Sequence, residues 1–177
     1  MVSDRYTLVE QLRRQIYGGQ PSDDSQITIG LVNLWLSQAI AFAAKQNYVD
    51  SVKLDGVSYV NNAFYTTYKG LSATVSDVDD SEYIVELPQV PVGIGTNEGV
   101  ASLRFKDGKS VSYEAIPLTT NQVAFQRGRR QVPNGILYYN EGNLVYCISP
   151  ELDLSQFTAV VRMVSGGDSS DLDSVVN

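Results

Sequence analysis

The sequence predicts an α+β protein in which two N-terminal helices precede an antiparallel β-sandwich or barrel-like domain and an extended C-terminal tail. Three observations support this class. Apolar residues follow helical spacing within residues 1–50, short alternating segments recur over residues 51–164, and residues 165–177 are small, polar and acidic. With 177 residues, of which 43% are hydrophobic, the chain can bury one substantial core.

The first helix is expected from Asp4 to Tyr17. Its apolar residues recur three to four positions apart and form one face, and its three arginines lie away from that face. Gly18 and Gly19 follow directly and are typical of a helix C-terminus. The apolar residues are Leu8, Val9, Leu12 and Ile16, and the arginines are Arg5, Arg13 and Arg14.

The second helix is expected to be capped by Thr28 and to continue to about Tyr48. Its apolar residues cover most of the circumference and leave only a narrow polar stripe at Asn33 and Ser37. A helix of this kind needs burial on more than one side. Two interpretations are open: a neighbouring subunit covers it, or it is the central helix of one compact domain. Its candidate interface residues are Trp35 and Phe42.

The same helix contains an uncharged stretch, residues 27–44, of the length at which a membrane span is considered. Thr28, Asn33, Ser37 and Gln38 interrupt this stretch, and no lysine or arginine lies just before it. We therefore expect a buried helix, with no membrane partner. The first residues also lack the apolar core of a signal peptide.

Aromatic and β-branched residues predominate from Val57 onward, after a turn at Asp55–Gly56. Asp107–Gly108 and Glu141–Gly142 favour tight turns, and they predict two antiparallel hairpins. A short helix can lie between the hairpins, within Thr120–Arg130. The expected strands cover residues 57–68, 82–87, 100–105, 110–116, 135–140, 143–148 and 157–164.

The composition argues against an enzyme. Histidine is absent, which removes the most common general base and the most common transition-metal ligand. The single cysteine, Cys147, lies in an apolar run and is expected to be a buried strand residue. The carboxylates are scattered along the chain, so no acid–base pair stands out. We expect no catalytic residue, no metal site and no cofactor.

Two further motifs are interpreted as structural. Gly93–Gly99 lacks the preceding strand and following helix of a nucleotide-binding loop, so it is expected to be a conformationally demanding loop. Asp77–Glu82 gathers carboxylates that could hold Ca²⁺. It lacks the spacing and central glycine of an EF-hand loop, and a solvated acidic turn is expected instead.

The net charge of −7 and the pI of about 4.5 argue against sequence-specific nucleic-acid binding, because an acidic surface repels phosphates. The one dense basic cluster contains Arg127, Arg129 and Arg130. Their guanidinium groups suit carboxylates or phosphates. We favour salt bridges to an acidic neighbour such as another copy of the chain, ahead of contact with a DNA backbone. A solvated loop is the alternative.

Residues 165–177 have no core of their own. They are either disordered or an arm that orders on a neighbouring copy. In the second case the anchors are Leu172, Val175 and Val176.

Several stretches also carry a resemblance to a known family. They are Leu54–Asn62 (LDGVSYVNN), Leu87–Gly95 (LPQVPVGIG), Ile116–Leu118 (IPL), Pro133–Tyr139 (PNGILYY) and Val161–Asp168 (VRMVSGGD), preceded by the uncharged helix Gly30–Ala44. Together they resemble the ring, or head-to-tail connector, proteins of crAss-like tailed bacteriophages. The resemblance spans nearly the whole chain and rests on structural signatures without a catalytic core.

The resemblance implies a structural virion protein at the junction of head and tail, made in the host cytoplasm. Its partners would be other copies of itself in a ring, expected to be a dodecamer, together with the portal and neighbouring tail or ring proteins. Packaged DNA would pass through the channel with at most non-specific contacts. An acidic wall suits this passage because it offers few contacts that release counterions.

Two competing interpretations come from other classes. A β-sandwich module for carbohydrate or peptide would use some of the 11 tyrosines as a stacking platform. It would leave the second helix without a role. A glycosidase-like enzyme has only the scattered carboxylates in its favour.

Overall fold

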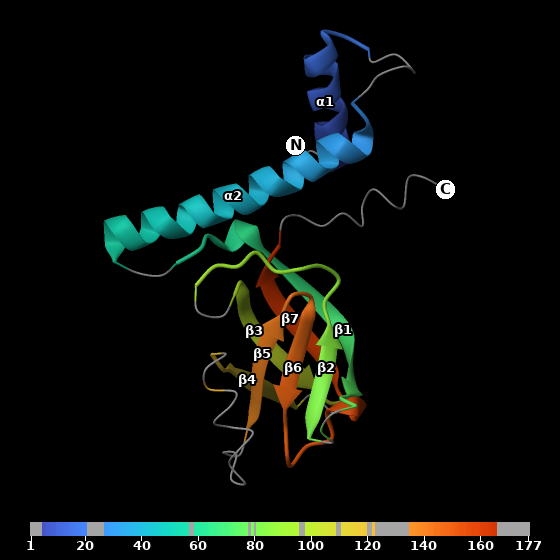
Figure 1. Ribbon diagram of the computed structural model, residues 1–177, viewed down its shortest axis with the longest axis vertical. Helices are drawn as coiled ribbons and strands as arrows, with labels where there is room; N and C mark the ends of the chain where they lie inside the picture. Colours follow the sequence, from blue (N-terminus) through green and yellow to red (C-terminus); the bar gives the residue numbers. More distant parts are fainter. Residues whose placement is uncertain are drawn as a thin grey trace.

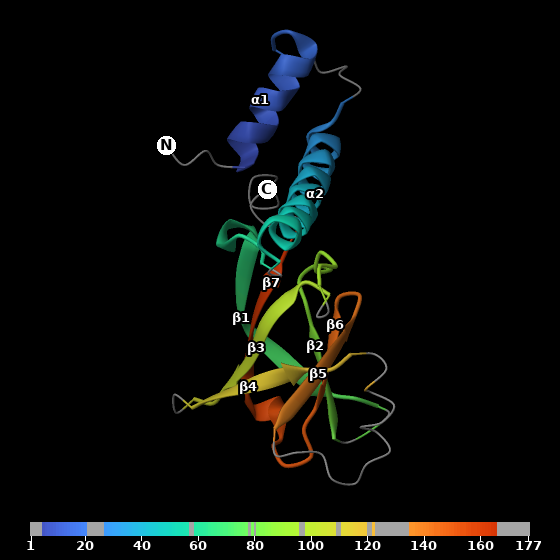
Figure 2. The same cartoon turned by 90° about the vertical axis from the view of Figure 1, so that its left-hand side faces the viewer.

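The computed structural model describes residues 5–20, 27–56, 59–77, 79, 81–95, 98–108, 111–119, 122 and 135–165. Two helices, α1 and α2, precede a closed barrel of seven strands, which confirms the α+β class. Helix α2 lies across one end of the barrel, and α1 projects from the start of α2 away from the strands (Figure 1). The view at 90° shows α1 beside α2 and clear of the barrel (Figure 2).

Helix α1 covers Arg5–Tyr17 and ends as expected at the two glycines. Gly18 has a φ of 67°, and the amide of Gly19 donates to the carbonyl of Arg14 at 2.9 Å. Val9 is buried, but the other three residues of the expected apolar face are exposed. The helix therefore packs along a narrow line and leaves much of its apolar side open. The exposed residues are Leu8, Leu12 and Ile16.

Helix α2 covers Ile29–Asp55, a length of about 40 Å. The predicted cap is confirmed, since the Thr28 hydroxyl accepts a hydrogen bond from the amide of Leu31 at 3.2 Å. The predicted end near Tyr48 is wrong. Gly56 ends the helix with a φ of 66°, and its amide donates to the carbonyl of Val52. Apolar and long polar residues keep the helical spacing up to that glycine.

The polar stripe on α2 is where α1 docks. Arg5 Nε donates to Asn33 Oδ1 at 2.6 Å, and the same guanidinium donates to Ser37 Oγ at 2.5 Å. Arg5 was expected to lie away from the packed face of α1, and this expectation is wrong. The planar guanidinium presents several donors in a fixed fork, which suits two acceptors one helical turn apart.

The strand expected from residue 57 begins later, after the 3₁₀ turn η1 at Asn62–Phe64, and a second such turn, η2, covers Leu154–Gln156. Around the barrel the strands follow the order β1-β2-β6-β5-β4-β3-β7. Their bounds are β1 Tyr65–Val75, β2 Glu82–Glu86, β3 Val100–Lys106, β4 Ser112–Pro117, β5 Ile136–Glu141, β6 Leu144–Ile148 and β7 Thr158–Val164.

Both predicted hairpins are confirmed, as β3 pairs with β4 and β5 with β6, each antiparallel. All other neighbours are antiparallel except β4 and β5, which pair in parallel. Parallel neighbours need a connection longer than a hairpin turn, and residues 118–135 supply that length.

Alternate residues of the strands fill the barrel. Cys147 is fully buried on β6, as predicted. Burial, with a contribution from the charge of Glu82, raises the pKa of its thiol. Burial also raises the pKa of Tyr138 to about 12, with smaller contributions from Cys147 and Glu114. Other fully buried residues in this core are Val85, Leu103, Phe105, Val145, Ala159, Val161 and Met163.

A second apolar cluster joins α2 to the end of the barrel. Ala44 of α2 is buried there against Val60, Val92 and Val164, with Tyr48 packed at the side. The Asn47 side chain accepts a hydrogen bond from the amide of Asn61 at 2.9 Å. The barrel is therefore covered at this end by one face of α2. The polar contact fixes how the helix lies on the cluster.

The loop before β3 supports this cluster and is conformationally demanding, as expected. Gly95, Glu98 and Gly99 all have positive φ. A Cβ added to Gly99 would lie 2.1 Å from the carbonyl oxygen of Val92, so no larger residue fits without movement of the backbone. The amide of Val92 donates to the carbonyl of Val164, and the amide of Val164 donates to the carbonyl of Gly99, each at 2.8 Å.

The acidic turn before β2 is only partly as expected. Asp79 lies at the surface of the protein, where it accepts hydrogen bonds from the amide and the hydroxyl of Ser81. Glu82 instead is buried, where its carboxylate accepts from the Tyr139 hydroxyl at 2.9 Å and the Ser76 hydroxyl at 3.2 Å. The expectation of a fully solvated turn is wrong at Glu82. A buried carboxylate needs such partners, because burial without hydrogen bonds costs several kcal/mol.

Candidate interaction surface

The side of α2 that faces away from the barrel carries large apolar side chains. Phe42 is 70% exposed and Trp35 is 44% exposed, and Val49 and Val52 are exposed beside them. Phe42 and the fully buried Ala44 are two positions apart, so they lie on opposite sides of the helix. We call Trp35, Phe42, Val49 and Val52 the α2 stripe.

The spacing of the α2 stripe is that of a helix-packing seam. Trp35, Phe42 and Val49 recur every seven residues, and Val52 follows three residues later. Apolar residues spaced by seven and three keep to one side of a helix and form the contact line of coiled coils. A surface of this kind is complementary to another helix or to an apolar segment laid along it.

The interpretation of this helix as the central helix of one compact domain is therefore wrong, and burial of its outer side by a neighbouring subunit stays a prediction. Helix α1 covers part of its N-terminal half and the barrel covers the side of Ala44, and the α2 stripe faces solvent in the single chain. Neither helix in the described ranges is long and apolar enough to cross a bilayer.

The described charged residues beside the α2 stripe are Lys45, Lys53 and Asp50, which accepts a hydrogen bond from Gln46, and their net charge is positive. Lys45 and Lys53 are exposed, and each lies four residues from Val49, on the same side of the helix. Among the described residues the one ion pair joins Arg13 and Glu10, at 2.9 Å, so neither lysine has a carboxylate partner there. An apolar segment that carries negative charge would match this surface.

The structure places two of the sequence-predicted interface residues, Trp35 and Phe42, on this one surface. Val49, Val52 and the two lysines were missed. The seven-residue spacing of Trp35 and Phe42 continues beyond the predicted helix end at Tyr48 and could have identified Val49. The remaining candidates, Arg127, Arg129, Arg130, Leu172, Val175 and Val176, lie outside the described residues.

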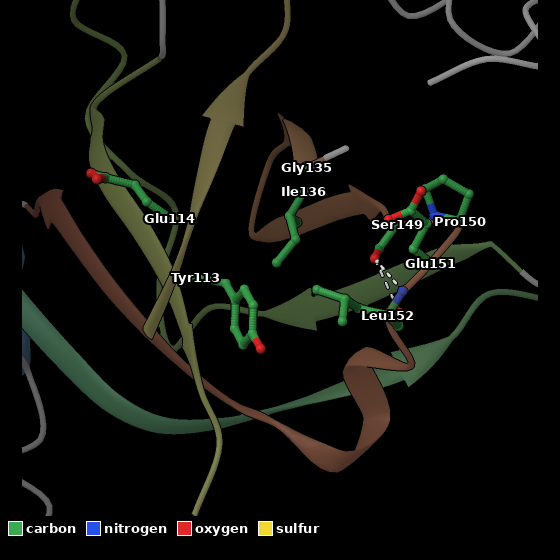
Figure 3. A pocket seen from close by; sticks show the side chains of 8 residues that line it. All are labelled: Tyr113, Glu114, Gly135, Ile136, Ser149, Pro150, Glu151 and Leu152. Atoms are coloured by element: carbon green, nitrogen blue, oxygen red, sulfur yellow. Dashed lines mark hydrogen bonds between the residues drawn. The ribbon is translucent and has the colours of Figure 1, made fainter. Parts of the chain in front are cut away.

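A second feature is a cleft of about 300 Å³ where β4 and β5 meet the loop after β6. Figure 3 shows apolar side chains of Tyr113, Ile136 and Leu152 between the carboxylates of Glu114 and Glu151, which come from opposite sides. The remaining lining residues are Gly135, Ser149 and Pro150.

Two contacts hold the walls of this cleft. The Ser149 hydroxyl donates to the carbonyl of Leu152 at 3.0 Å and accepts from its amide, which fixes the loop that carries Glu151. The Tyr113 ring packs edge-on against Phe157, with centroids 5.6 Å apart.

The cleft can bind a small ligand, but it offers limited stacking surface. Its volume is at the lower limit for small-molecule sites, and its exposed carboxylates suit hydroxyl groups or cations. Tyr113 is the only tyrosine that lines it. Tyr138 is buried in the barrel core, whereas Tyr139 is buried on the other face of β5, where Tyr146 stacks on it with centroids 5.0 Å apart. The tyrosine platform expected for a carbohydrate module is therefore not formed by these residues.

In the described ranges, no group of three or more cysteine, aspartate and glutamate residues is placed to hold a metal ion. No family model matches this chain, and no curated protein is similar to it in sequence.

Proposed function

We propose that this chain is a structural subunit of a head-to-tail connector ring in a tailed bacteriophage, where it joins the portal to the tail and surrounds the DNA channel. Its partners are other copies of itself and the neighbouring portal or tail proteins. The observation that carries the proposal is the α2 stripe, a helix seam that the single chain leaves uncovered.

The size of this surface is adequate for a partner. An aromatic side chain buries roughly 150–250 Å², so the exposed parts of Trp35 and Phe42 alone amount to about 200 Å². The valines of the stripe and the open side of α1 extend the apolar surface along the helical region. Protein interfaces bury about 800 Å² on each partner, with buried aromatic side chains near their centre. The two helices supply an apolar centre for such an interface, and the barrel can supply its polar rim.

The negative net charge of the chain supports the proposed position around a DNA channel. The chain has a net charge of −7, and residues 59–165 contain eleven carboxylates and eight basic side chains. An acidic wall repels the DNA backbone and does not retain it, which suits a channel through which DNA slides.

The test is the mass of the protein in solution, measured by light scattering over a range of concentrations, alone and after co-expression with the portal protein. Phe42→Asp is expected to weaken association about a hundredfold. Removing roughly 130 Å² of buried apolar area costs about 3 kcal/mol at 25 cal/mol per Å². Val111→Asp is the matched control, because Val111 is exposed on the β3–β4 hairpin, outside the α2 stripe. Association that is unchanged in Phe42→Asp would contradict the proposal.

The alternative is a binding module for carbohydrate or peptide, and the cleft between Glu114 and Glu151 is the observation in its favour. A chain that stays monomeric with and without the portal, and that binds a glycan in a manner abolished by Glu151→Ala, would support this alternative.

A further inference from the structure

We propose that the chain's own C-terminal tail, residues 166–177, docks on the α2 stripe in the single subunit. The docking surface is made of described residues, and the occupant is identified by three observations: where the tail begins, how far it reaches and what charge it carries. The docking itself is independent of the proposed function, and its effect on assembly rests on that function.

The tail begins directly beneath α2. Strand β7 ends at Val164, which packs in the same cluster as Ala44 of α2. Ser165 is buried next to it, and its hydroxyl lies 2.8 Å from the hydroxyl of Thr66. The residues that follow therefore start at the barrel-facing side of α2, opposite the α2 stripe.

The tail is long enough to reach the outer side. Seven residues separate Ser165 from Leu172, and an extended chain of that length spans about 23 Å. A chain laid on the outside of a helix about 10 Å wide runs roughly 8 Å from the helix axis, so passing around half of the helix takes roughly 25 Å. An extended chain therefore brings Leu172 to the edge of the α2 stripe, and Val175 and Val176 follow it onto the stripe.

The apolar residues of the tail match a narrow apolar surface. Leu172, Val175 and Val176 are spaced by three and four residues, so one turn of helix would gather them on one side. The α2 stripe presents Phe42 and Val49 to such a side. Covering these groups removes apolar area from water on both partners.

The charges of the two partners are opposite. The tail carries Asp168, Asp171 and Asp173 and no basic residue, whereas Lys45 and Lys53 lie beside the α2 stripe. Asp171 and Asp173 flank Leu172 in the sequence, so their carboxylates can face the lysines while Leu172 meets Phe42. This match favours the tail over the basic helix α1 of another copy.

Covalent attachment favours the chain's own tail over that of a neighbour. A short flexible tether gives an effective concentration on the order of millimolar, so even a weak contact is occupied within one chain. In a ring, the neighbouring subunit must then displace the tail from the α2 stripe. The tail would act as a removable cover that keeps free subunits apart.

Trp35 provides a direct readout, because it is the single tryptophan of the chain and lies on the α2 stripe. Quenching of its fluorescence by acrylamide is measured at concentrations where light scattering gives the monomer mass. Deletion of residues 166–177 should raise the quenching constant about twofold, because the tail excludes water from the indole. Leu172→Asp combined with Val175→Asp should have the same effect. Ser169→Ala combined with Ser174→Ala is the control and should have none.

Salt separates the charge contribution from the apolar one. Raising the ionic strength should increase quenching in the full chain and not in the deletion variant, since screening weakens the contacts of the aspartates with Lys45 and Lys53. Equal quenching in the full chain and the deletion variant would overturn the proposal.

The mass of the deletion variant then distinguishes the remaining possibilities. If the tail covers the α2 stripe within one chain, its deletion should strengthen self-association. Weaker association after deletion would mean that the tail binds a neighbour, and would overturn docking within the chain. Higher quenching with an unchanged mass would support the docking, but it would count against the α2 stripe as an assembly surface.

Discussion

Replacing Gly99 by alanine tests how the barrel supports α2. Gly99 has a φ of 88°, a conformation that an L-residue with a Cβ adopts only at a cost of about 1–2 kcal/mol. The new methyl group would also lie 2.1 Å from the Val92 carbonyl oxygen and 2.9 Å from the carbonyl carbon. Both neighbours are backbone atoms, so relief requires the loop to move away from β7.

That movement endangers two hydrogen bonds at 2.8 Å, from Val92 to Val164 and from Val164 to Gly99. Each is worth about 1 kcal/mol net. Together with the backbone strain, the expected loss in the free energy of unfolding is about 3 kcal/mol. The control is Gly93→Ala in the same loop, because a Cβ there meets nothing within 4 Å and φ is not positive. That variant should be neutral or more stable by about 0.4–1 kcal/mol.

Urea unfolding followed by circular dichroism measures both variants. With a denaturant dependence of about 2 kcal/mol per molar, the midpoint of Gly99→Ala should fall by roughly 1.5 M relative to the parent chain. If the two glycine variants unfold within about 0.5 kcal/mol of each other, a value typical of neutral surface changes, the steric reasoning is refuted.

Two further predictions concern buried titratable groups. Glu82→Ala removes the acceptor of the Tyr139 hydroxyl and should lower the free energy of unfolding by about 2–3 kcal/mol. Glu86 is exposed on the same strand, so Glu86→Ala should lower it by less than about 0.5 kcal/mol. A similar loss of stability in both variants, measured by urea unfolding, would contradict this role of Glu82. Because the pKa of Tyr138 is raised from 10.0 to about 12 in the folded chain, stability should be unaffected by this group below pH 10 and fall as the pH rises toward 12. The buried Cys147 thiol, whose pKa is also raised, should add to this alkaline loss, and a Tyr138→Phe variant with an unchanged pH dependence would rule out the tyrosine contribution.

Local signals in the sequence were sufficient for several elements. The Thr28 cap, the Gly18–Gly19 helix end and the turns at Asp107–Gly108 and Glu141–Gly142 depend on a few neighbouring residues, and all are confirmed. Such features are set by backbone preferences within one or two turns. The buried position of Cys147 followed from the apolar run around it.

Features set by distant residues could not be predicted. The pairing of β1 with β7 and of β2 with β6 joins strands that are far apart in the sequence. Glu114 and Glu151 are more than thirty residues apart in the sequence, and they line one cleft only because β4 pairs with β5 and β5 with β6. The burial of Glu82 likewise requires Tyr139, which a different strand supplies.

The α2 stripe was predicted only in part, because its exposure also depends on distant residues. Trp35 and Phe42 stood out because the second helix has more apolar residues than one small domain needs. The turn at Gly56 was read correctly, but the residues before it were not assigned to the helix, so Val49 and Val52 were missed. Which side of α2 would face solvent depended on the barrel, and no local pattern specifies that.

The closure of the sheet limits how copies of this chain can recognise one another. Each strand has a hydrogen-bonded neighbour on both sides, but the pairing along β1 and β4 is partial. Strand β7 pairs with residues 65–72 of β1 and β2 with residues 73–75, while β3 pairs with residues 112–114 of β4 and β5 with residues 115–117. Backbone-templated association, the common route to fibres and to strand exchange, is thereby confined to the stretches of β1 and β4 that pair on one side only. Recognition through the helices uses side chains instead, and its specificity can be altered by single substitutions there without disturbing the hydrogen bonds of the sheet.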